Sequence, residues 1–346
     1  MTPHPSRRQR ALRTWAVATS VLVVLALGLA ACTSSGRDVD LSSKGLRKLR
    51  VVLDWTPNTN HSGLYLAKAK GWYRAAGLDV SFVQPGDSTS LQILAAGKAD
   101  VAVSVAEEVI PARAHGLPVQ SIGAIIQHDT SGLVTLKSDH IDRPRDLEGK
   151  TYGGYGGPIE EPLVKKLVAC DGGDPSKVKF VNVGEADYRI GLQRNQYDTV
   201  WIFDGWDGIR LQQIDKVKTG ELRFIDHTDC IPDWYTPLLA TSTKVERARP
   251  GDLKAFMAAT ARGYRVAMAH PDEAVDALMA ASPDLDRRLV TLSARYLATR
   301  YADDPTKWGM QQASIWSGFA RFLTDAGIVK GKVDAKSAWT NEYLPT

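Results

Sequence analysis

The stretch VVLDWTPNTNHSGLYLAKAKGWY, residues 51–73, reads as an apolar β-strand, a polar turn and a helix that ends at Gly71. The strand ends on an acid and an indole, Asp54 and Trp55. The same order continues downstream, with strands predicted at 78–84, 99–105 and 118–127 and helices predicted at 88–97 and 106–116. This repetition predicts a mostly parallel sheet with helices on both faces.

A second series of strands and helices follows a charged loop around Pro144. Its strands are predicted at 150–156, 177–183 and 197–205, its helices at 159–170 and 186–195, and a return strand at 235–246 precedes a helical C-terminal region. A chain of 346 residues exceeds the length at which one core usually divides. We therefore predict an α/β fold with two lobes joined by two crossover segments, a geometry that suits hinge closure on a ligand. The expected lobes are residues 48–139 with 236–346, and residues 140–235.

The N-terminal residues carry the pattern of an export signal. Residues 1–31 contain four arginines, then an apolar run, then small residues before Cys32, as in the signals of bacterial lipoproteins. We expect cleavage before Cys32, lipidation of its thiol and a polar tether over residues 32–47. This would hold the protein on the extracytoplasmic face of the cell membrane. An ordinary signal peptide and an uncleaved membrane anchor are the alternatives, and the export route, general or twin-arginine, stays open.

Charge gives no indication of a nucleic-acid partner. The chain has 43 Lys and Arg residues against 39 Asp and Glu residues, but four of the arginines belong to the expected leader. The rest of the chain is formally neutral, so its basic isoelectric point is not evidence for nucleic-acid binding. We expect a monomer.

The residue spacing predicts neither a metal site nor a catalytic nucleophile. The seven histidines are scattered, and no G-x-S-x-G or S-x-x-K motif is present. We therefore expect no metal and no cofactor. After export, Cys170 and Cys230 would be in an oxidising compartment. They would either form a disulfide or remain two separate buried thiols, and the sequence does not decide between these alternatives.

Acidic and aromatic side chains recur at four predicted strand ends. Because ligands of open α/β sheets bind outside the carboxyl ends of the strands, these side chains are candidates for a binding site. The aromatic candidates are Trp55, Tyr155, Trp201 and Phe203, and the acidic candidates are Asp54, Glu107, Glu108, Glu160 and Asp204. This set suits a flat heterocycle with amino groups, which would stack on the rings and donate hydrogen bonds to the carboxylates.

Several candidates also have a purely structural interpretation. Asp54 would accept hydrogen bonds from turn amides, Trp201 would lie in a core, and His61 would be a capping neighbour at a helix start. Glu107 and Glu108 would favour a helix N-terminus through the helix dipole.

Four segments resemble the solute-binding lipoproteins of ABC importers that are related to the yeast thiamine-pyrimidine synthase. They are LDWTPNTNHSGLYLAKAKGWYRAAGLDV (53–80), GKADVAVSVAEEVIPARAHGLPV (97–119), DLEGKTYGGYGGPIEE (146–161) and CIPDWYTPLL (230–239). The resemblance implies a two-lobed type II periplasmic binding protein fold, an ABC permease as partner and a thiamine pyrimidine precursor as ligand. Formylaminopyrimidine and hydroxymethylpyrimidine are the expected ligands, with riboflavin or a related ring as the alternative.

The resemblance also implies roles for individual residues. Asp54 and Trp55 would contact the pyrimidine, and Trp201 would stack on it from the other lobe. The remaining residues implied at or near the pocket are Glu107, Glu160, Phe203, Asp204 and Tyr235. We expect His61, a helix-start residue, at the edge of the pocket.

A pyrimidine synthase is the alternative of a different class, and three features disfavour it. Glu108 stands where the fungal synthase has its active-site histidine, the loop GGPIEE lacks the lysine, and the cysteine-rich run is reduced to Cys230. A receptor for sulfonate, nitrate or another anion would share the fold, but it would prefer basic residues where this chain has acids.

Overall fold

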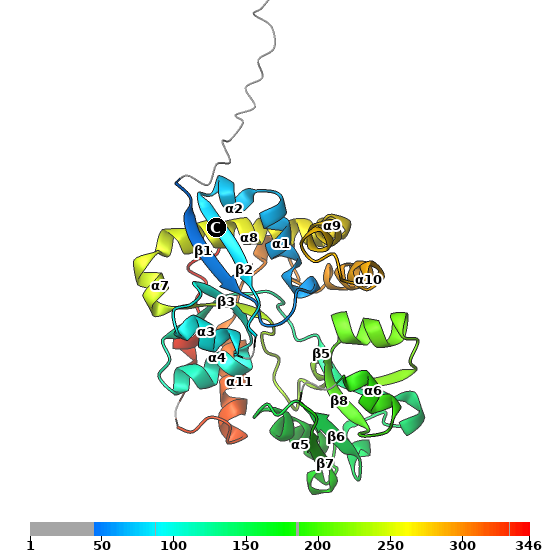
Figure 1. Cartoon of the computed structure of the whole chain (residues 1–346). Coiled ribbons are helices and arrows are strands. Elements are labelled where there is room, and N and C mark those ends of the chain that lie inside the picture. Colours follow the sequence, from blue (N-terminus) through cyan, green and yellow to red (C-terminus); the bar gives the residue numbers. More distant parts are fainter. Residues whose placement is uncertain (1–44, 87, 185–186, 332) are drawn as a thin grey trace, which may run out of the picture. The chain divides into compact units, whose positions relative to one another are not determined.

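The computed structural model describes residues 45–86, 88–184, 187–331 and 333–346 (Figure 1). The expected leader, the lipidation site Cys32 and residues 33–44 of the expected tether lie outside the described residues. Among the described helices, none combines the length and the apolarity needed to cross a membrane.

The first sheet contains the strand that ends at Asp54. Its strands are β1 (Arg47–Val52), β2 (Leu78–Val83), β3 (Val101–Ser104), β4 (Val119–Ala124) and β10 (Leu238–Ser242), in the order β2-β1-β3-β10-β4. Strands β2, β1 and β3 are parallel, whereas β10 is antiparallel to both of its neighbours. The carboxyl ends of β1, β2 and β3 therefore meet at one edge of the sheet.

Helices cover both faces of this sheet, as the sequence predicts. They are α1 (Ser62–Ala69), α2 (Trp72–Ala75), α3 (Ser90–Ala95), α4 (Ala106–Ala114), α7 (Thr243–Ala248), α8 (Pro250–Ala269), α9 (Pro271–Ala281), α10 (Arg287–Leu297) and α11 (Ala313–Asp325). Successive residues of β1 point to opposite faces, so Val51 packs in the core with α1 and α8 while Val52 packs in the core with α3, α4 and α11. Figure 1 shows these two groups of helices apart from each other.

Helices α1 and α8 approach each other closely. A Cβ atom added at Gly263 of α8 would lie 2.0 Å from the carbonyl oxygen of Gly63 in α1. Only glycine permits this approach, which brings Tyr264 of α8 against the turn before α1, where its hydroxyl donates to Asn60 O at 2.6 Å.

The second sheet contains β5 (Ser131–Leu136), β6 (Thr151–Gly154), β7 (Lys179–Asn182), β8 (Thr199–Phe203) and β9 (Thr219–Arg223), in the order β7-β6-β8-β5-β9. Helices α5 (Glu160–Cys170) and α6 (Tyr188–Gln193) belong to the same part of the chain. Strand β6 is parallel to β7 and β8, but β5 is antiparallel to β8 and β9. Both sheets are therefore mixed, but four of the five strands in each run in the same direction, and only β10 and β5 run against the others. The expectation of a mostly parallel sheet thus holds apart from one reversed strand in each sheet.

The division into lobes stays a proposal. The second sheet begins at Ser131, before the boundary at residue 140 that we expected from the sequence, so we place the boundary between β4 and β5. Residues 125–130 and 228–237 then form the two crossover segments.

The two crossover segments are bonded to each other. His128 Nδ1 lies 2.5 Å from Asp233 Oδ2, the backbone N–H of Asp129 donates to Asp233 Oδ1 at 2.9 Å, and Ile125 N donates to Pro237 O at 3.0 Å. The hydrogen bond to Asp233 is the main cause that raises the pKa of His128 to about 9. The crossover segments therefore form one bonded unit between the sheets.

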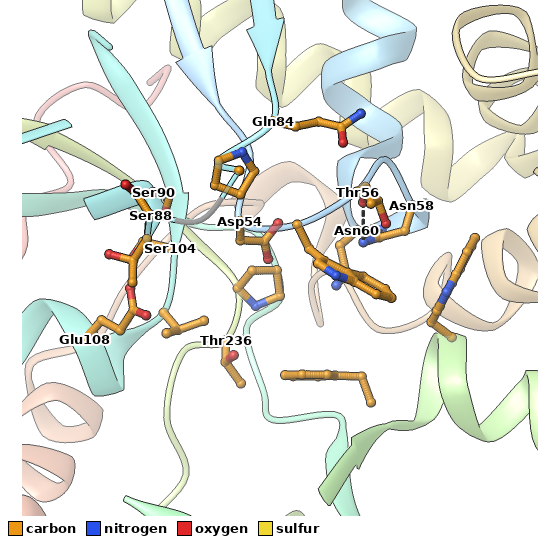
Figure 2. A pocket seen from close by; sticks show the side chains of 18 of the residues that line it. Asp54, Thr56, Asn58, Asn60, Gln84, Ser88, Ser90, Ser104, Glu108 and Thr236 are labelled. Atoms are coloured by element: carbon orange, nitrogen blue, oxygen red, sulfur yellow. Dashed lines mark hydrogen bonds between the residues drawn. The ribbon is translucent and has the colours of Figure 1, made fainter. Parts of the chain in front are cut away.

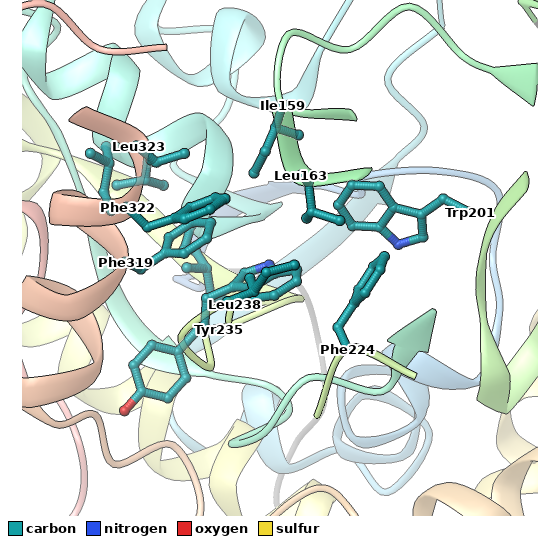
Figure 3. Close-up of a cluster of buried hydrophobic side chains, with 14 of the residues drawn as sticks. Ile159, Leu163, Trp201, Phe224, Tyr235, Leu238, Phe319, Phe322 and Leu323 are labelled. Atoms are coloured by element: carbon teal, nitrogen blue, oxygen red, sulfur yellow. The ribbon is translucent and has the colours of Figure 1, made fainter. Parts of the chain in front are cut away.

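A run of aromatic rings connects the second sheet to helix α11 through the second crossover segment. Trp201 of β8 lies edge-on to Phe224 and Trp234, and Trp234 stacks on Phe319 of α11 at a centroid distance of 5.1 Å. Figure 3 shows Trp201, Phe224 and Phe319 in the same buried cluster. Cys170, the last residue of α5, forms a disulfide with Cys230 of this crossover segment, so the first of the two open alternatives holds in the structure.

Candidate functional site

A cavity of about 890 Å³ lies where the strand ends of the two sheets face each other. The first sheet and its loops contribute Asp54, Trp55, Thr56, Asn58, Asn60, Gln84, Pro85, Gly86, Ser88, Thr89, Ser90, Ser104, Val105 and Glu108. The second sheet contributes Phe203, Trp206 and Asp207, and the second crossover segment contributes Thr236 and Pro237. In Figure 2, Asp54 lies between Ser104 and Glu108 on one side and Asn58 and Asn60 on the other.

Four of the residues predicted from the sequence line this cavity together. Asp54 and Trp55 follow β1, Glu108 is in the first turn of α4, and Phe203 ends β8 on the opposite wall. The Trp55 side chain is 51% exposed, although burial of an indole is strongly favourable. An exposed indole beside a carboxylate at the cavity wall is what a flat ligand would cover.

His61 supports Asp54 from behind and does not line the cavity. Its side chain is fully buried in the turn η1 (Thr59–His61), which precedes α1. Nδ1 accepts a hydrogen bond from the backbone N–H of Asn58 at 3.2 Å, and Nε2 lies 2.7 Å from Asp54 Oδ1. The expectation that His61 stands at a helix start agrees with this position.

Glu108 is the second carboxylate of the cavity. It is in the first turn of α4, and its Oε2 accepts a hydrogen bond from Ser104 Oγ at 3.3 Å. Burial raises the pKa of Glu108, and the Asp54 carboxylate raises it further. Glu107, in contrast, is not a lining residue; burial raises the pKa of its carboxyl group well above the ordinary value.

Thr236 places a free hydroxyl at the cavity from the second crossover segment. Its side chain is completely buried, and its Oγ1 has no hydrogen-bond partner among the described residues. Because an unpaired buried hydroxyl is costly, a ligand group that reached this enclosed oxygen would gain a favourable hydrogen bond. A ligand bonded here would contact the segment that joins the two sheets.

Trp201 and Tyr235 lie in the core rather than in the cavity lining. Trp201 packs in the aromatic run described above, and the Tyr235 hydroxyl accepts a hydrogen bond from Gln312 N at 2.7 Å. Both side chains are almost fully buried. The structural interpretation of Trp201 therefore agrees with its position.

Glu160 and Tyr155 belong to the glycine-rich loop after β6. Glu160 is buried and accepts hydrogen bonds from Tyr152 Oη at 2.7 Å and from the backbone N–H groups of Tyr155 and Gly157 at 2.9 and 2.5 Å. Its carboxylate therefore already accepts hydrogen bonds from the backbone N–H groups with which a glycine-rich loop could bind an anion. The Tyr155 side chain is 43% exposed and is not among the residues that line the cavity.

Asp204 begins the short π-helical turn η5 (Asp204–Gly208) directly after β8. It is buried and does not line the cavity; the hydroxyl of Tyr296 in α10 donates to its Oδ2 at 3.3 Å. Burial and the neighbouring carboxyl group of Glu221 raise the pKa of Asp204. In this structure Asp204 therefore contacts Tyr296 and lies beside Glu221, and it does not face a ligand in the cavity.

Sequence reasoning missed several lining residues. Trp206 and Asp207 follow β8 in η5, and the lining residues of the loop between β2 and α3 are 84–86 and 88–89, with Ser90 at the start of α3. The rule that ligands bind at the carboxyl ends of strands applies equally to β2, so the same signal could have found this loop. Asn58 and Asn60 lie inside the stretch 51–73, only a few residues after Trp55.

The lining is acidic. Asp54, Glu108 and Asp207 contribute carboxyl groups, and no lysine or arginine lines the cavity within the described part of the chain. Asp207 is already bonded to Tyr188 Oη at 2.9 Å and to Phe203 N at 3.2 Å, which leaves Asp54 and Glu108 to meet a ligand. No cluster of three or more His, Cys, Asp or Glu side chains could hold a metal ion in the described ranges. The arrangement favours a ligand that donates hydrogen bonds over an anion.

The chain is similar to several known proteins. The sequence profile of the family described as NMT1/THI5 like matches residues 58–274. The formylaminopyrimidine-binding protein of Halalkalibacterium halodurans is 28% identical over 92% of this chain and 97% of that protein. The 4-amino-5-hydroxymethyl-2-methylpyrimidine phosphate synthase of Legionella pneumophila is 25% identical over 86% of this chain and 92% of that protein.

A solved structure shows the fold. The periplasmic aliphatic sulphonate binding protein SsuA of Escherichia coli superposes with a TM-score of 0.66 at 17% identity, covering 86% of this chain and 99% of that one. The chain thus has the two-lobed type II periplasmic binding protein fold that the sequence predicted.

Proposed function

This chain belongs to the NMT1/THI5-like family, and from that premise we propose that it is the solute-binding component of an ABC importer. It binds a thiamine-type aminopyrimidine precursor between its two lobes and delivers it to a permease. A formylaminopyrimidine-binding relative that is similar over nearly the whole chain supports this proposal.

The observation that carries the proposal is the pairing of Asp54 with Trp55 in a cavity that no cation lines within the described residues. The indole offers a face to a flat ring, and the carboxylate accepts hydrogen bonds from the ring's amino group. Glu108 and the Thr236 hydroxyl provide further acceptors on other walls.

The synthase alternative finds less support in these residues. A phosphate ester needs cations or free backbone amides, but the loop amides of Tyr155 and Gly157 already donate to Glu160. Glu108 adds a carboxylate to the same cavity. We therefore propose that the chain binds its pyrimidine without converting it.

Titration of the purified protein with a series of ring compounds tests this function. Hydroxymethylpyrimidine or its formylamino relative is expected to change the tryptophan fluorescence, because Trp55 and Trp206 line the cavity. The phosphate ester of hydroxymethylpyrimidine is expected to bind at least tenfold more weakly, since Asp54 and Glu108 repel it. Riboflavin, thiamine and an alkanesulfonate serve as comparison ligands. Absence of saturable binding by any aminopyrimidine would contradict the ligand assignment.

We also propose that the protein is a monomer held on the extracytoplasmic face of the cell membrane by a lipid on Cys32. In a bacterial host, the wild-type chain is expected in the membrane fraction, with an N-terminal peptide that begins at a lipid-modified Cys32. The Cys32→Ser variant is expected to lose both the modification and the new N-terminus. Mass spectrometry of the N-terminal peptide checks this, and an unmodified wild-type Cys32 would refute it.

A further inference from the structure

His61 is a buried histidine whose two ring nitrogens both have assigned partners. Nδ1 lies 3.2 Å from the backbone nitrogen of Asn58, and Nε2 lies 2.7 Å from Asp54 Oδ1. A backbone N–H can only donate, so Nδ1 must be the unprotonated acceptor. The proton of the neutral ring therefore lies on Nε2 and points at the Asp54 carboxylate.

The turn that carries His61 is held rigidly from behind. The hydroxyl groups of Tyr264 and Tyr301 donate to the backbone oxygens of Asn60 and Thr59 at 2.6 and 2.5 Å. The ring of Tyr264 is itself stacked on Trp308 at 4.3 Å. These contacts fix the position of the imidazole, and the imidazole fixes Asp54 Oδ1.

We propose that His61 is a positioning residue that orients the Asp54 carboxylate and thereby sets the preference of the cavity for amino-bearing rings. This rests on the function proposed above. Oδ1 of Asp54 is engaged by Nε2–H, so Oδ2 is the oxygen left to accept a hydrogen bond from the ligand. A carboxylate held in this way pays less side-chain entropy on binding than one free to rotate.

Two ligands and two variants separate this role from a general structural one. The ligands are 4-amino-5-hydroxymethyl-2-methylpyrimidine and 5-hydroxymethyl-2-methylpyrimidine, which lacks the amino group. We expect His61→Leu to weaken binding of the amino compound about tenfold and of the other compound less than threefold. His61→Gln, which keeps an N–H donor and an acceptor, is expected to restore most of the preference for the amino compound.

An equal loss for both ligands in His61→Leu, or an unchanged preference for the amino compound, would overturn the proposal. Failure of the wild-type protein to bind either ligand would instead overturn the function on which the proposal rests. If His61→Leu does not fold, ¹⁵N NMR of the wild-type histidines decides, with the His61 signals assigned from their loss in His61→Gln. A proton on Nε2 supports the proposal, and a proton on Nδ1 refutes it.

Discussion

Asp54→Asn is expected to weaken binding of the aminopyrimidine by about 2 to 3 kcal/mol, which is roughly 30- to 140-fold in Kd. The substitution removes the charge that strengthens a hydrogen bond from the ligand. It also creates a mismatch. His61 Nε2–H requires an acceptor, so the amide oxygen of the asparagine would face His61 and its NH₂ group would face the cavity. There it would meet the amino group of the ligand, donor against donor.

Isothermal titration calorimetry measures this loss directly. Asp325→Asn is a matched control, because Asp325 is an exposed aspartate at the end of α11 that does not line the cavity. Thermal unfolding of both variants shows whether the fold is kept. An Asp54→Asn protein that binds within threefold of wild type would show that the ligand does not donate to this carboxylate.

The part of the site that could be predicted from the sequence is the part that regular strands position. Asp54 and Trp55 end an apolar strand, so the rule for strand ends places them correctly at the cavity. The choice between Glu107 and Glu108 depends instead on the rotation of α4, where adjacent residues differ by about 100° around the axis. Only Glu108 lines the cavity, although both acids stand at the same helix start.

Trp201 shows a second limit of prediction from the sequence. Trp201 and Phe203 point to the same face of β8, and alternation assigns them the same environment. The structure buries Trp201 against Trp234 of the crossover segment, whereas Phe203 reaches the cavity. A contact with a segment more than 30 residues away in the sequence cannot be predicted from the alternation of residues within β8.

Strands β5 and β9 were not predicted from the sequence, and their composition explains why. In β9, TGELR, only Leu222 is buried, so no alternation of apolar residues marks the strand. In β5, a Cβ atom at Gly132 would lie 2.7 Å from the carbonyl oxygen of Leu222. Glycine is required there by the approach of β9, but in the sequence it reads as a turn signal.

Removing the disulfide between Cys170 and Cys230 is expected to lower the free energy of unfolding by about 2 to 4 kcal/mol. The bond links residues 60 apart in sequence, so its loss frees a long loop in the unfolded chain. Urea unfolding of the Cys170→Ser, Cys230→Ser double variant measures the change. Reduced wild-type protein should show the same loss, and the double variant should not respond to a reductant.

Loss of the disulfide is expected to lower the stability of the protein without lowering its affinity for the ligand. It ties the second crossover segment to the end of α5, and neither cysteine lines the cavity. The double variant should therefore bind the ligand within about threefold of wild type at temperatures where it stays folded. A much larger loss of affinity would mean that the crossover segment needs this tie to hold Thr236 at the cavity, because Thr236 lies only six residues after Cys230. Unchanged stability in the double variant would contradict the cross-link itself.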